Sequence, residues 1–178
     1  GNVGVIGVIS NVIVDDVGPD VQWLQPPPVL TNASDVSFSV IGIGESVSGF
    51  VSGFHVVMSS LSSQEVMWSE FVDANGSDSA VVTVSGLLSG VYNVSVIGVD
   101  GLGNVGVAGV WLLVTVDHDA PTSTFGAVSR YMNSSEMTIP VSGSDSQSSY
   151  VLYYRLDGGD WMVVDGDVIV LSSLIDGH

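Results

Sequence analysis

The sequence predicts an all-β protein built from two tandem β-sandwich domains, and three observations lead to this prediction. Short runs rich in Val, Ile and Thr recur along the 178 residues and are separated by Gly, Ser, Asn and Asp, a spacing typical of sandwiches. No segment keeps a 3.6-residue apolar period over the length of a helix. The chain also repeats itself, and a complete copy has the roughly 100-residue size of one sandwich.

The repeat aligns without gaps at two places. Residues 1–19 (GNVGVIGVISNVIVDDVGP) match residues 103–121 (GNVGVAGVWLLVTVDHDAP), and residues 85–90 (SGLLSG) match residues 172–177 (SSLIDG). We therefore predict three parts along the chain. They are an N-terminal strand over residues 1–16, a first domain over residues 17–117 and a second domain over residues 118–178.

The first copy contains seven strand-like segments, which is the number of strands in an immunoglobulin-like sandwich. They are residues 21–24, 36–43, 54–58, 65–71, 80–85, 91–99 and 105–116. Side chains alternate between the two faces of a strand, so Tyr92, Val94 and Val96 should face the core while Asn93 and Ser95 face solvent. The first domain is thus predicted to be a complete immunoglobulin-like sandwich.

The second copy contains five strand-like segments. They are residues 124–128, 137–142, 150–156, 161–164 and 168–171. The Asp-Gly-Gly-Asp run at residues 157–160 is a strong hairpin signal between the third and fourth segments. Counterparts of the last two strands of the first copy are lacking, so we predict a second immunoglobulin-like sandwich that is incomplete.

The motifs of residues 85–106 resemble the late strands of bacterial immunoglobulin-like, fibronectin III-like and cadherin-like extracellular repeats. In those families a Leu-x-x-Gly-x-Tyr turn, here LLSGVY, leads into a strand that ends in Asp-x-x-Gly-Asn, here DGLGN. The junction at residues 116–121 and the hairpin at residues 154–161 are similar to theirs as well. The resemblance implies an extracellular repeat module and a tyrosine-corner role for Tyr92, but no single activity.

The charge of the chain excludes one class of partner and points to a modification. The net charge of −17 comes from 19 acidic residues against two basic ones, Arg130 and Arg155. Nucleic-acid binding needs Lys and Arg to neutralise phosphates and is not expected. Charged residues make up only 12% of the chain, about half the usual share. Attached glycans would supply the missing solubility.

Two other classes of structure are also not expected. The chain has no Cys, which removes disulfides, thiol catalysis and thiolate metal sites. No apolar stretch reaches the roughly 20 residues that a membrane-spanning helix needs.

Four Asn-x-Ser sequons are candidate glycosylation sites. Their asparagines are Asn32, Asn75, Asn93 and Asn133. The first and last occupy equivalent positions of the repeat, the second lies in a predicted turn, and the third points outward from a predicted strand. The alternative interpretation is an ordinary polar surface, because the motif is short.

Acidic residues gather at the predicted junction between the domains. Asp117, Asp119 and Asp145 could supply oxygen ligands to a Ca²⁺ ion, as in cadherins. The chain lacks the paired-Asn linker and the remote acidic motifs of cadherins. The alternative is a set of solvated turn residues, and no other cofactor is expected.

The sequence does not predict an enzyme. His55, His118 and His178 are scattered and match no triad order or metal-ligand spacing. Four tryptophans, Trp23, Trp68, Trp111 and Trp161, could stack on sugars, although core packing is the alternative.

The N-terminal strand is the candidate polymerisation element. Its apolar residues are Val3, Val5, Ile6, Val8, Ile9, Val12, Ile13 and Val14. Residues 1–8 (GNVGVIGV) match residues 92–99 (YNVSVIGV), so the strand in excess resembles a strand that the second copy lacks. The main hypothesis is a structural subunit of an extracellular, glycosylated filament, assembled head-to-tail by β-strand complementation.

Other organisations remain open at this stage. The repeats could continue in one covalent array. The chain could also be an adhesin or carbohydrate-binding stalk module of a cell-surface repeat protein, or an accessory domain of a surface enzyme.

Overall fold

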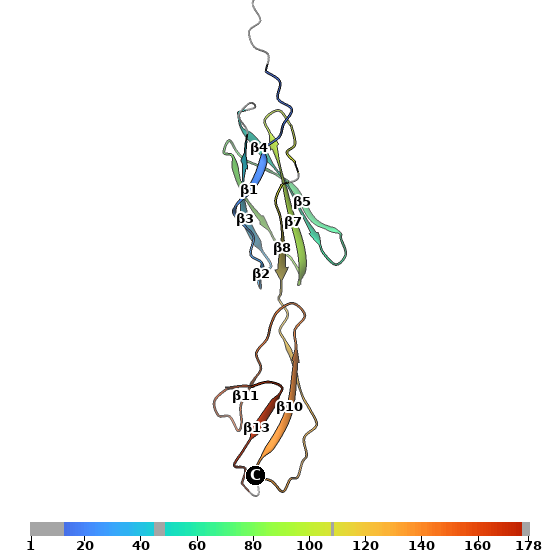
Figure 1. Cartoon of the computed structure of the whole chain (residues 1–178), viewed down its shortest axis with the longest axis vertical. Helices are drawn as coiled ribbons and strands as arrows, with labels where there is room; N and C mark the ends of the chain where they lie inside the picture. The colour runs from blue at the N-terminus through green and yellow to red at the C-terminus, as the bar shows by residue number, and fades with distance from the viewer. Residues whose placement is uncertain (1–12, 45–48, 108, 176–178) are drawn as a thin grey trace, which may run out of the picture. The chain divides into compact units, whose positions relative to one another are not determined.

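The computed structural model describes residues 13–44, 49–107 and 109–175 and contains strands but no helix in these ranges (Figure 1). Consequently, no helix in the described ranges is long and apolar enough to cross a membrane. The chain divides into two compact units that meet between Val116 and Asp117. The two units are described separately below as unit 1 and unit 2.

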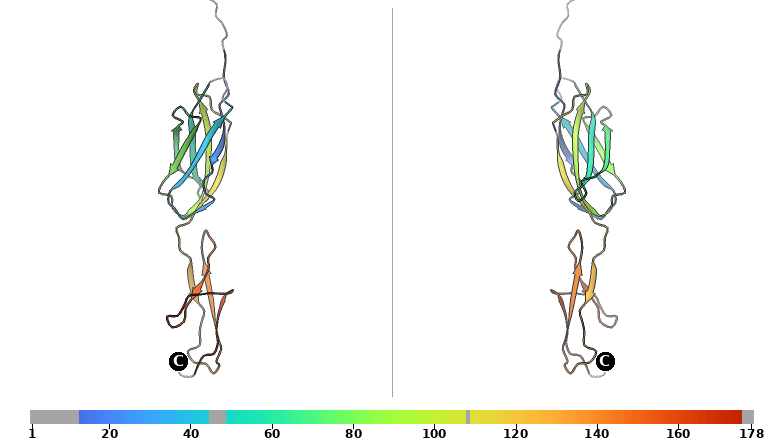
Figure 2. Two further views of the ribbon diagram at one scale, coloured as in Figure 1. Left: turned by 90° about the vertical axis from the view of Figure 1, so that its left-hand side faces the viewer. Right: turned by 90° about the vertical axis from the view of Figure 1, so that its right-hand side faces the viewer.

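Unit 1 consists of two sheets (Figure 2). The first has the order β1-β3-β6, with β1 (Asp20–Gln25), β3 (Val36–Ile43) and β6 (Ser79–Val84). The second has the order β2-β8-β7-β4-β5, with β2 (Leu30–Thr31), β8 (Trp111–Val116), β7 (Gly90–Asp100), β4 (Val51–Ser60) and β5 (Val66–Asp73). Neighbouring strands are antiparallel except β2 and β8. This division into three and five strands is that of an immunoglobulin-like sandwich, as predicted.

The core of unit 1 lies between the two sheets and follows the alternation of the strands. Phe38 on β3 and Phe54 and Met58 on β4 are the largest fully buried side chains. The Trp23 ring meets the Phe38 ring edge-on, with centroids 5.4 Å apart. Full burial of each such side chain stabilises the fold by about 1.5–3 kcal/mol.

Strand β7 confirms the predicted faces and the predicted tyrosine corner. Tyr92, Val94 and Val96 are buried, and Asn93 and Ser95 alternate with them as partly exposed residues. The Tyr92 hydroxyl donates a hydrogen bond of 2.9 Å to a carbonyl oxygen four residues upstream, in the turn that precedes the strand.

Unit 2 contains one three-stranded sheet and one hairpin. The sheet has the order β13-β10-β9, with β13 (Val168–Leu171), β10 (Met137–Ser144) and β9 (Thr122–Phe125). The hairpin pairs β11 (Tyr153–Tyr154) with β12 (Met162–Val163).

The sheet of unit 2 repeats the β1-β3-β6 sheet in the same register. Trp23 opposes Val40 in unit 1, and Phe125 opposes Val141 in unit 2. The turn after the last strand also recurs, because the Leu87 N–H donates to the Ser34 carbonyl at 2.9 Å and the Leu174 N–H donates to the Ser135 carbonyl at 3.0 Å. The sequence repeat is therefore a structural repeat.

Every predicted strand overlaps an observed one. The predicted segments 124–128 and 161–164 run past the ends of β9 and β12, and two other predictions were much too long. The segment 105–116 forms a strand only from Trp111, and Val105 makes an isolated bridge to Val99. Its first part contains Gly106 and Gly109, and glycine inside a strand pattern marks a break or a close backbone approach, here of Gly106 to Pro19. The segment 150–156 shortens to the two residues of β11.

Strand β2 was not predicted, because it is only two residues long and follows three prolines that have no N–H to donate.

Candidate functional site: an open sandwich and a surface hollow

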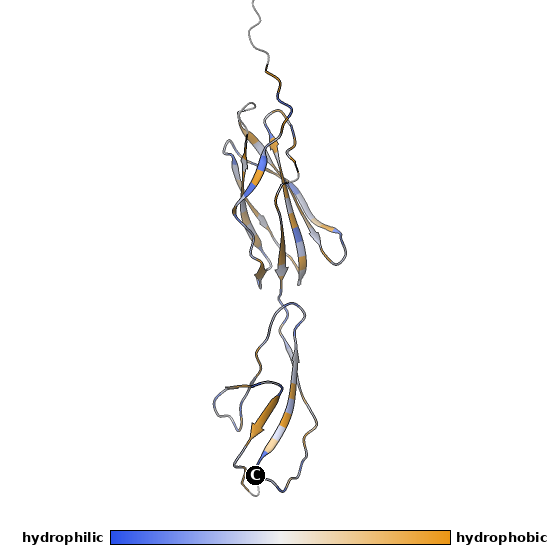
Figure 3. Cartoon of the chain, in the orientation of Figure 1, coloured by the Kyte–Doolittle hydropathy of each residue, from blue (hydrophilic) through white to orange (hydrophobic). Residues whose placement is uncertain are grey.

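Unit 2 leaves many of its apolar side chains uncovered. Figure 3 shows that hydrophobic residues are frequent along its strands, β13 above all. Among its described residues, Val141 and Ile169 are the buried hydrophobic ones. The exposed large hydrophobic residues are Phe125, Val128, Tyr131, Met132, Tyr150, Val151, Tyr153, Leu156, Trp161, Met162, Val163, Val170 and Ile175. An apolar surface of this extent is unusual for a finished core and is a candidate interaction face.

The exposure has a specific structural cause. Trp23 on β1 is partly buried against the core of unit 1, whereas its counterpart Phe125 on β9 is 71% exposed. In unit 1 the sheet that contains β7 and β8 covers this side of the core. No counterpart of those two strands occurs among the described residues of unit 2. Within the same residues, β11 pairs with β12 and its other edge has no partner strand.

The predicted polymerisation strand lies mostly outside the described residues. This applies to Val3, Val5, Ile6, Val8, Ile9 and Val12. Ile13 and Val14 are described, belong to no strand of this chain and are 74% and 81% exposed.

From Asp15 onward the chain packs against the loop between β7 and β8. The side-chain amide of Asn104 donates a hydrogen bond of 3.0 Å to the Asp15 carbonyl oxygen. Gly18 and Pro19 lie directly against the backbone of Val105 and Gly106. The segment that leads into β1 is therefore fixed to unit 1 as far as Asp15.

The same turn follows Val14 and Val116. The Val17 N–H donates to Asp15 Oδ1 at 3.3 Å, and the Asp119 N–H donates to Asp117 Oδ1 at 3.1 Å. Val14 thus precedes β1 through the same turn by which Val116, the last residue of β8, precedes β9.

Asp100 closes the loop after β7. Its Oδ1 accepts hydrogen bonds from the Leu102 N–H at 2.8 Å and the Asn104 N–H at 2.7 Å, and its Oδ2 accepts one from Asn104 Nδ2 at 2.8 Å. Burial alone would raise the pKa of Asp100, but these hydrogen bonds outweigh it and hold the pKa below the ordinary value. The carboxylate therefore stabilises the loop that follows β7.

The structure brings two of the three predicted calcium ligands together. Asp145 Oδ1 accepts hydrogen bonds from the Ser148 N–H at 2.8 Å and the Gln147 N–H at 3.0 Å. These backbone donors outweigh the effect of burial and lower the pKa of Asp145, on which the neighbouring Asp117 side chain acts as well. Asp119 is exposed. In the described part of the chain no group of three or more His, Asp or Glu side chains could hold a metal ion, and the calcium site stays a prediction.

Three of the four sequon asparagines are exposed. Asn32 lies just after β2, Asn75 lies in the turn between β5 and β6, and Asn133 precedes β10. Asn75 has a φ of +51° and donates its side-chain amide to the Asp73 carbonyl at 3.3 Å. Their modification stays a prediction.

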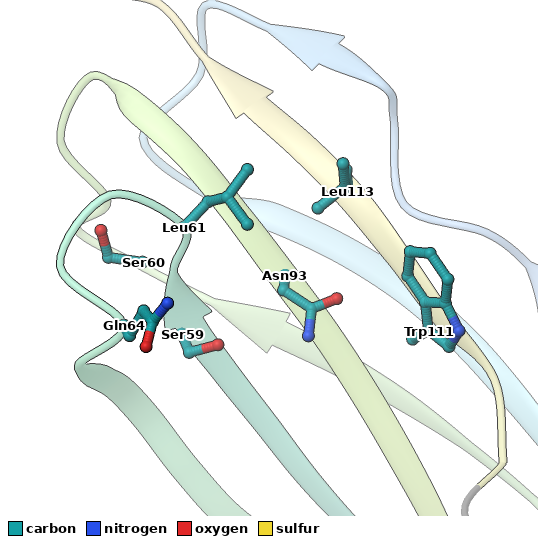
Figure 4. Close-up of a pocket in the computed structure, with 7 residues that line it drawn as sticks. All are labelled: Ser59, Ser60, Leu61, Gln64, Asn93, Trp111 and Leu113. Atoms are coloured by element: carbon teal, nitrogen blue, oxygen red, sulfur yellow. The ribbon is translucent and has the colours of Figure 1, made fainter.

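The fourth sequon asparagine, Asn93, lines a hollow of about 520 Å³ on the outer face of the five-stranded sheet (Figure 4). The lining residues are Ser59, Ser60, Leu61, Gln64, Asn93, Trp111 and Leu113. Asn93 is half-buried, and its Oδ1 is buried with no hydrogen-bond partner. The sequence indicated Asn93 as a surface residue but did not indicate that β4 and β8 would enclose it.

The tryptophans divide into two pairs. Trp23 and Trp68 pack against the core of unit 1, in agreement with the structural interpretation. Trp111 is 67% exposed, and Trp161 is 63% exposed with the Arg155 guanidinium 4.9 Å from its ring centroid.

The two described histidines belong to different units. The His55 ring contacts the Phe71 ring with centroids 5.0 Å apart, and His118 is an exposed residue just after Asp117. His178 lies outside the described residues.

No protein-family model matches the chain, and no curated protein matches it. Among solved structures, the chicken CNTN1 FN1–FN3 domains match 90% of this chain with 17% identity and a TM-score of 0.43. The CARDB domain of a Pyrococcus furiosus protein, solved in complex with di-metal ions, matches 62% of this chain with 14% identity and a TM-score of 0.33.

The chain spans 58% of the length of the CNTN1 structure and the match covers 99% of the CARDB structure. At these TM-scores neither likeness carries an argument about function. The fold class rests on the strand order itself, which is that of an immunoglobulin-like, all-β repeat.

Proposed function

We propose that the protein is a structural subunit of an extracellular filament, in which the N-terminal segment of one copy completes unit 2 of the next. The observation that carries the proposal is the uncovered apolar face of unit 2, which lacks counterparts of β7 and β8 among its described residues. An added strand would cover this face and pair with the open edge of β11, because main-chain hydrogen bonds allow an extended segment to join a sheet.

The sequence of the N-terminal segment fits the position of β7. Residues 1–8 are identical to residues 92–99 at six of eight positions. Val94 and Val96 of β7 are fully buried, and their matches are Val3 and Val5. Burying these two side chains would contribute about 1.5–3 kcal/mol each. In this register Val3 and Val5 enter the core of unit 2 of the next copy, and Asn2 and Gly4 lie on the outer face of the added strand.

Glycans on the exposed sequons are part of the same proposal. Asn32, Asn75 and Asn133 are exposed, and only 12% of the residues are charged. Sugars at these positions would keep an apolar-rich polymer soluble outside the cell. This supports an extracellular location for the filament.

The test compares two variants of the full chain by negative-stain electron microscopy and multi-angle light scattering. The unmodified chain should form fibres as its concentration rises. Val3→Asp with Val5→Asp should abolish fibres, because two carboxylates would enter an apolar core. The matched control, Asn2→Ser with Gly4→Ser, changes the other face of the same strand and should still form fibres.

Two results would contradict the proposal. One is an unmodified chain that stays monomeric at high concentration. The other is equal fibre formation by the Val3→Asp, Val5→Asp variant and its control, which would mean that another segment or another partner covers unit 2.

A further inference from the structure

We infer that the outer face of the five-stranded sheet of unit 1 carries a binding site for a neutral saccharide, centred on Trp111. This inference is independent of filament assembly, because the site lies wholly within unit 1. It rests on the register of three strands, on an unmet hydrogen-bond acceptor, and on the absence of charge from the lining.

The strand register places the lining residues in two neighbouring rows. Asn93 on β7 lies directly opposite Leu113 on β8 and Ser59 on β4. Ser95, two residues further along β7, lies opposite Trp111. The indole of Trp111 therefore lies one row from the Asn93 amide on the same outer face (Figure 4).

The turn between β4 and β5 forms a wall at the other side of the hollow. The Leu61 N–H donates to the Val91 carbonyl at 2.8 Å, which fixes the turn against β7. Gln64 has a φ of +59°, a left-handed conformation that is uncommon for a side chain of this type. The hydrogen bond from the Gln64 N–H to the Ser60 carbonyl, 2.9 Å long, holds this conformation within the turn and keeps Gln64 at the rim of the hollow.

Asn93 provides the polar group at the centre of the site. Its Oδ1 is buried and has no hydrogen-bond partner. A buried acceptor without a partner is unfavourable, so a ligand hydroxyl that donates to it would remove this cost. Hydroxyls of Ser59 and Ser60 and the amide of Gln64 lie around the same hollow.

The chemistry of the lining selects an uncharged ligand with one apolar face. None of the lining residues is charged, and unit 1 contains neither Lys nor Arg, so an anion would find no counter-charge. A pyranose ring has a face of C–H groups that stacks on an exposed indole, and a rim of hydroxyls that suits amide and hydroxyl partners. The volume of about 520 Å³ lies within the roughly 300–1,000 Å³ range of small-molecule sites.

The saccharide could come from two sources, which share this chemistry. Asn93-Val94-Ser95 is a sequon, so the sugar could be the base of a glycan attached to Asn93 that folds onto Trp111. It could also belong to a free glycan that docks in the same place.

Two experiments separate these sources. Peptide mass spectrometry of the protein from its native source tests for hexose or N-acetylhexosamine on Asn93. In parallel, the unglycosylated full chain is titrated with cellobiose and with N,N′-diacetylchitobiose while the indole and amide signals are followed by NMR. We expect either a glycan on Asn93 or saturable shifts of the Trp111 and Asn93 side-chain signals at millimolar sugar.

The control is another exposed tryptophan. Trp111→Ala should reduce the saccharide affinity at least tenfold, whereas Trp161→Ala should leave it unchanged. If Asn93 carries the glycan, its enzymatic removal should increase quenching of the Trp111 fluorescence by acrylamide in a variant that keeps this tryptophan alone. Absence of both the glycan and the titration shifts would overturn the inference, as would shifts that persist in Trp111→Ala.

Discussion

At the residue scale, two polar side chains hold the end of β7 and the turn before it. Tyr92 is buried and its hydroxyl closes the turn at Leu88, while Asp100 collects three hydrogen bonds at the opposite end of the strand. Both satisfy groups that the strand ladder leaves unpaired, which is a general requirement for buried backbone. Each residue therefore makes a separate contribution to stability that can be measured.

The tyrosine corner can be tested by removing one oxygen atom. Tyr92→Phe keeps the buried ring but leaves the Leu88 carbonyl without its donor. We expect the free energy of unfolding of unit 1 to fall by about 0.5–1.5 kcal/mol, measured by urea denaturation. Tyr131→Phe, at an exposed position of unit 2, is the matched control. Equal stability of Tyr92→Phe and the unmodified chain would show that the hydrogen bond contributes nothing net.

The carboxylates of Asp100 and Asp145 predict a loss of stability in acid. Both folded-state pKa values lie below the ordinary value of 3.8. The unfolded state therefore binds protons more readily than the folded state. The contribution of the two carboxylates to the free energy of unfolding is complete above the ordinary pKa and disappears as the pH falls through the folded-state pKa. We expect the free energy of unfolding to decline as the pH is lowered below about 4.

The Asp100→Asn variant provides the comparison for this pH series. It should be less stable than the unmodified chain at neutral pH, and its stability should decline less steeply in acid. Urea denaturation between neutral pH and acid measures both profiles. Parallel profiles would rule out the assigned role of Asp100.

At the element scale, the sequence identified strands well where alternation and turns agreed. For β3 and β13 both predicted bounds were correct, because apolar residues alternate with polar ones in β3 and form one apolar run between turns in β13. The strand predicted over residues 150–156 is limited to the two residues of β11. In unit 1 the related strand β4 pairs with β7 on one side and β5 on the other, whereas β11 pairs only with β12 among the described residues. Residue patterns alone do not show whether such a neighbour is present.

The candidate sites were predictable to different degrees. The repeat predicted that counterparts of β7 and β8 do not occur among the described residues of unit 2, and the sequons could be read directly. The hollow around Asn93 could not be predicted, because it depends on which residues of β4 and β8 oppose it. A register of this kind follows from long-range pairing and not from local composition.

The contact between the segment before β1 and the loop after β7 predicts an effect of one added methyl group. A Cβ on Gly106 would collide with the Pro19 carbonyl oxygen. Gly106→Ala should therefore lower the stability of unit 1 by about 1–3 kcal/mol. The control is Gly90→Ala, where a Cβ would meet only the Tyr92 ring at 3.6 Å or more. If both variants are equally stable in urea, the segment does not depend on this close approach.

At the scale of the whole molecule, the two units differ in how much of their apolar surface is covered. Strands β3 and β10 occupy equivalent positions in their sheets, but β3 lies under a second sheet of five strands, whereas the described residues of unit 2 add only the β11–β12 hairpin. A strand whose amides are protected only by its own sheet opens more often to solvent. If a second copy completes unit 2, the protection of β10 should depend on protein concentration, since binding stabilises only the folded partner.

Hydrogen exchange measured by mass spectrometry tests this difference within one molecule. Peptides that cover β10 should exchange rapidly in dilute protein and become protected as the concentration rises, whereas peptides that cover β3 should be protected throughout. In the Val3→Asp, Val5→Asp variant the concentration dependence of β10 should disappear, while β3 should be unchanged. Equal protection of β10 and β3 in dilute monomer would mean that unit 2 is stable by itself and needs no strand from a neighbour.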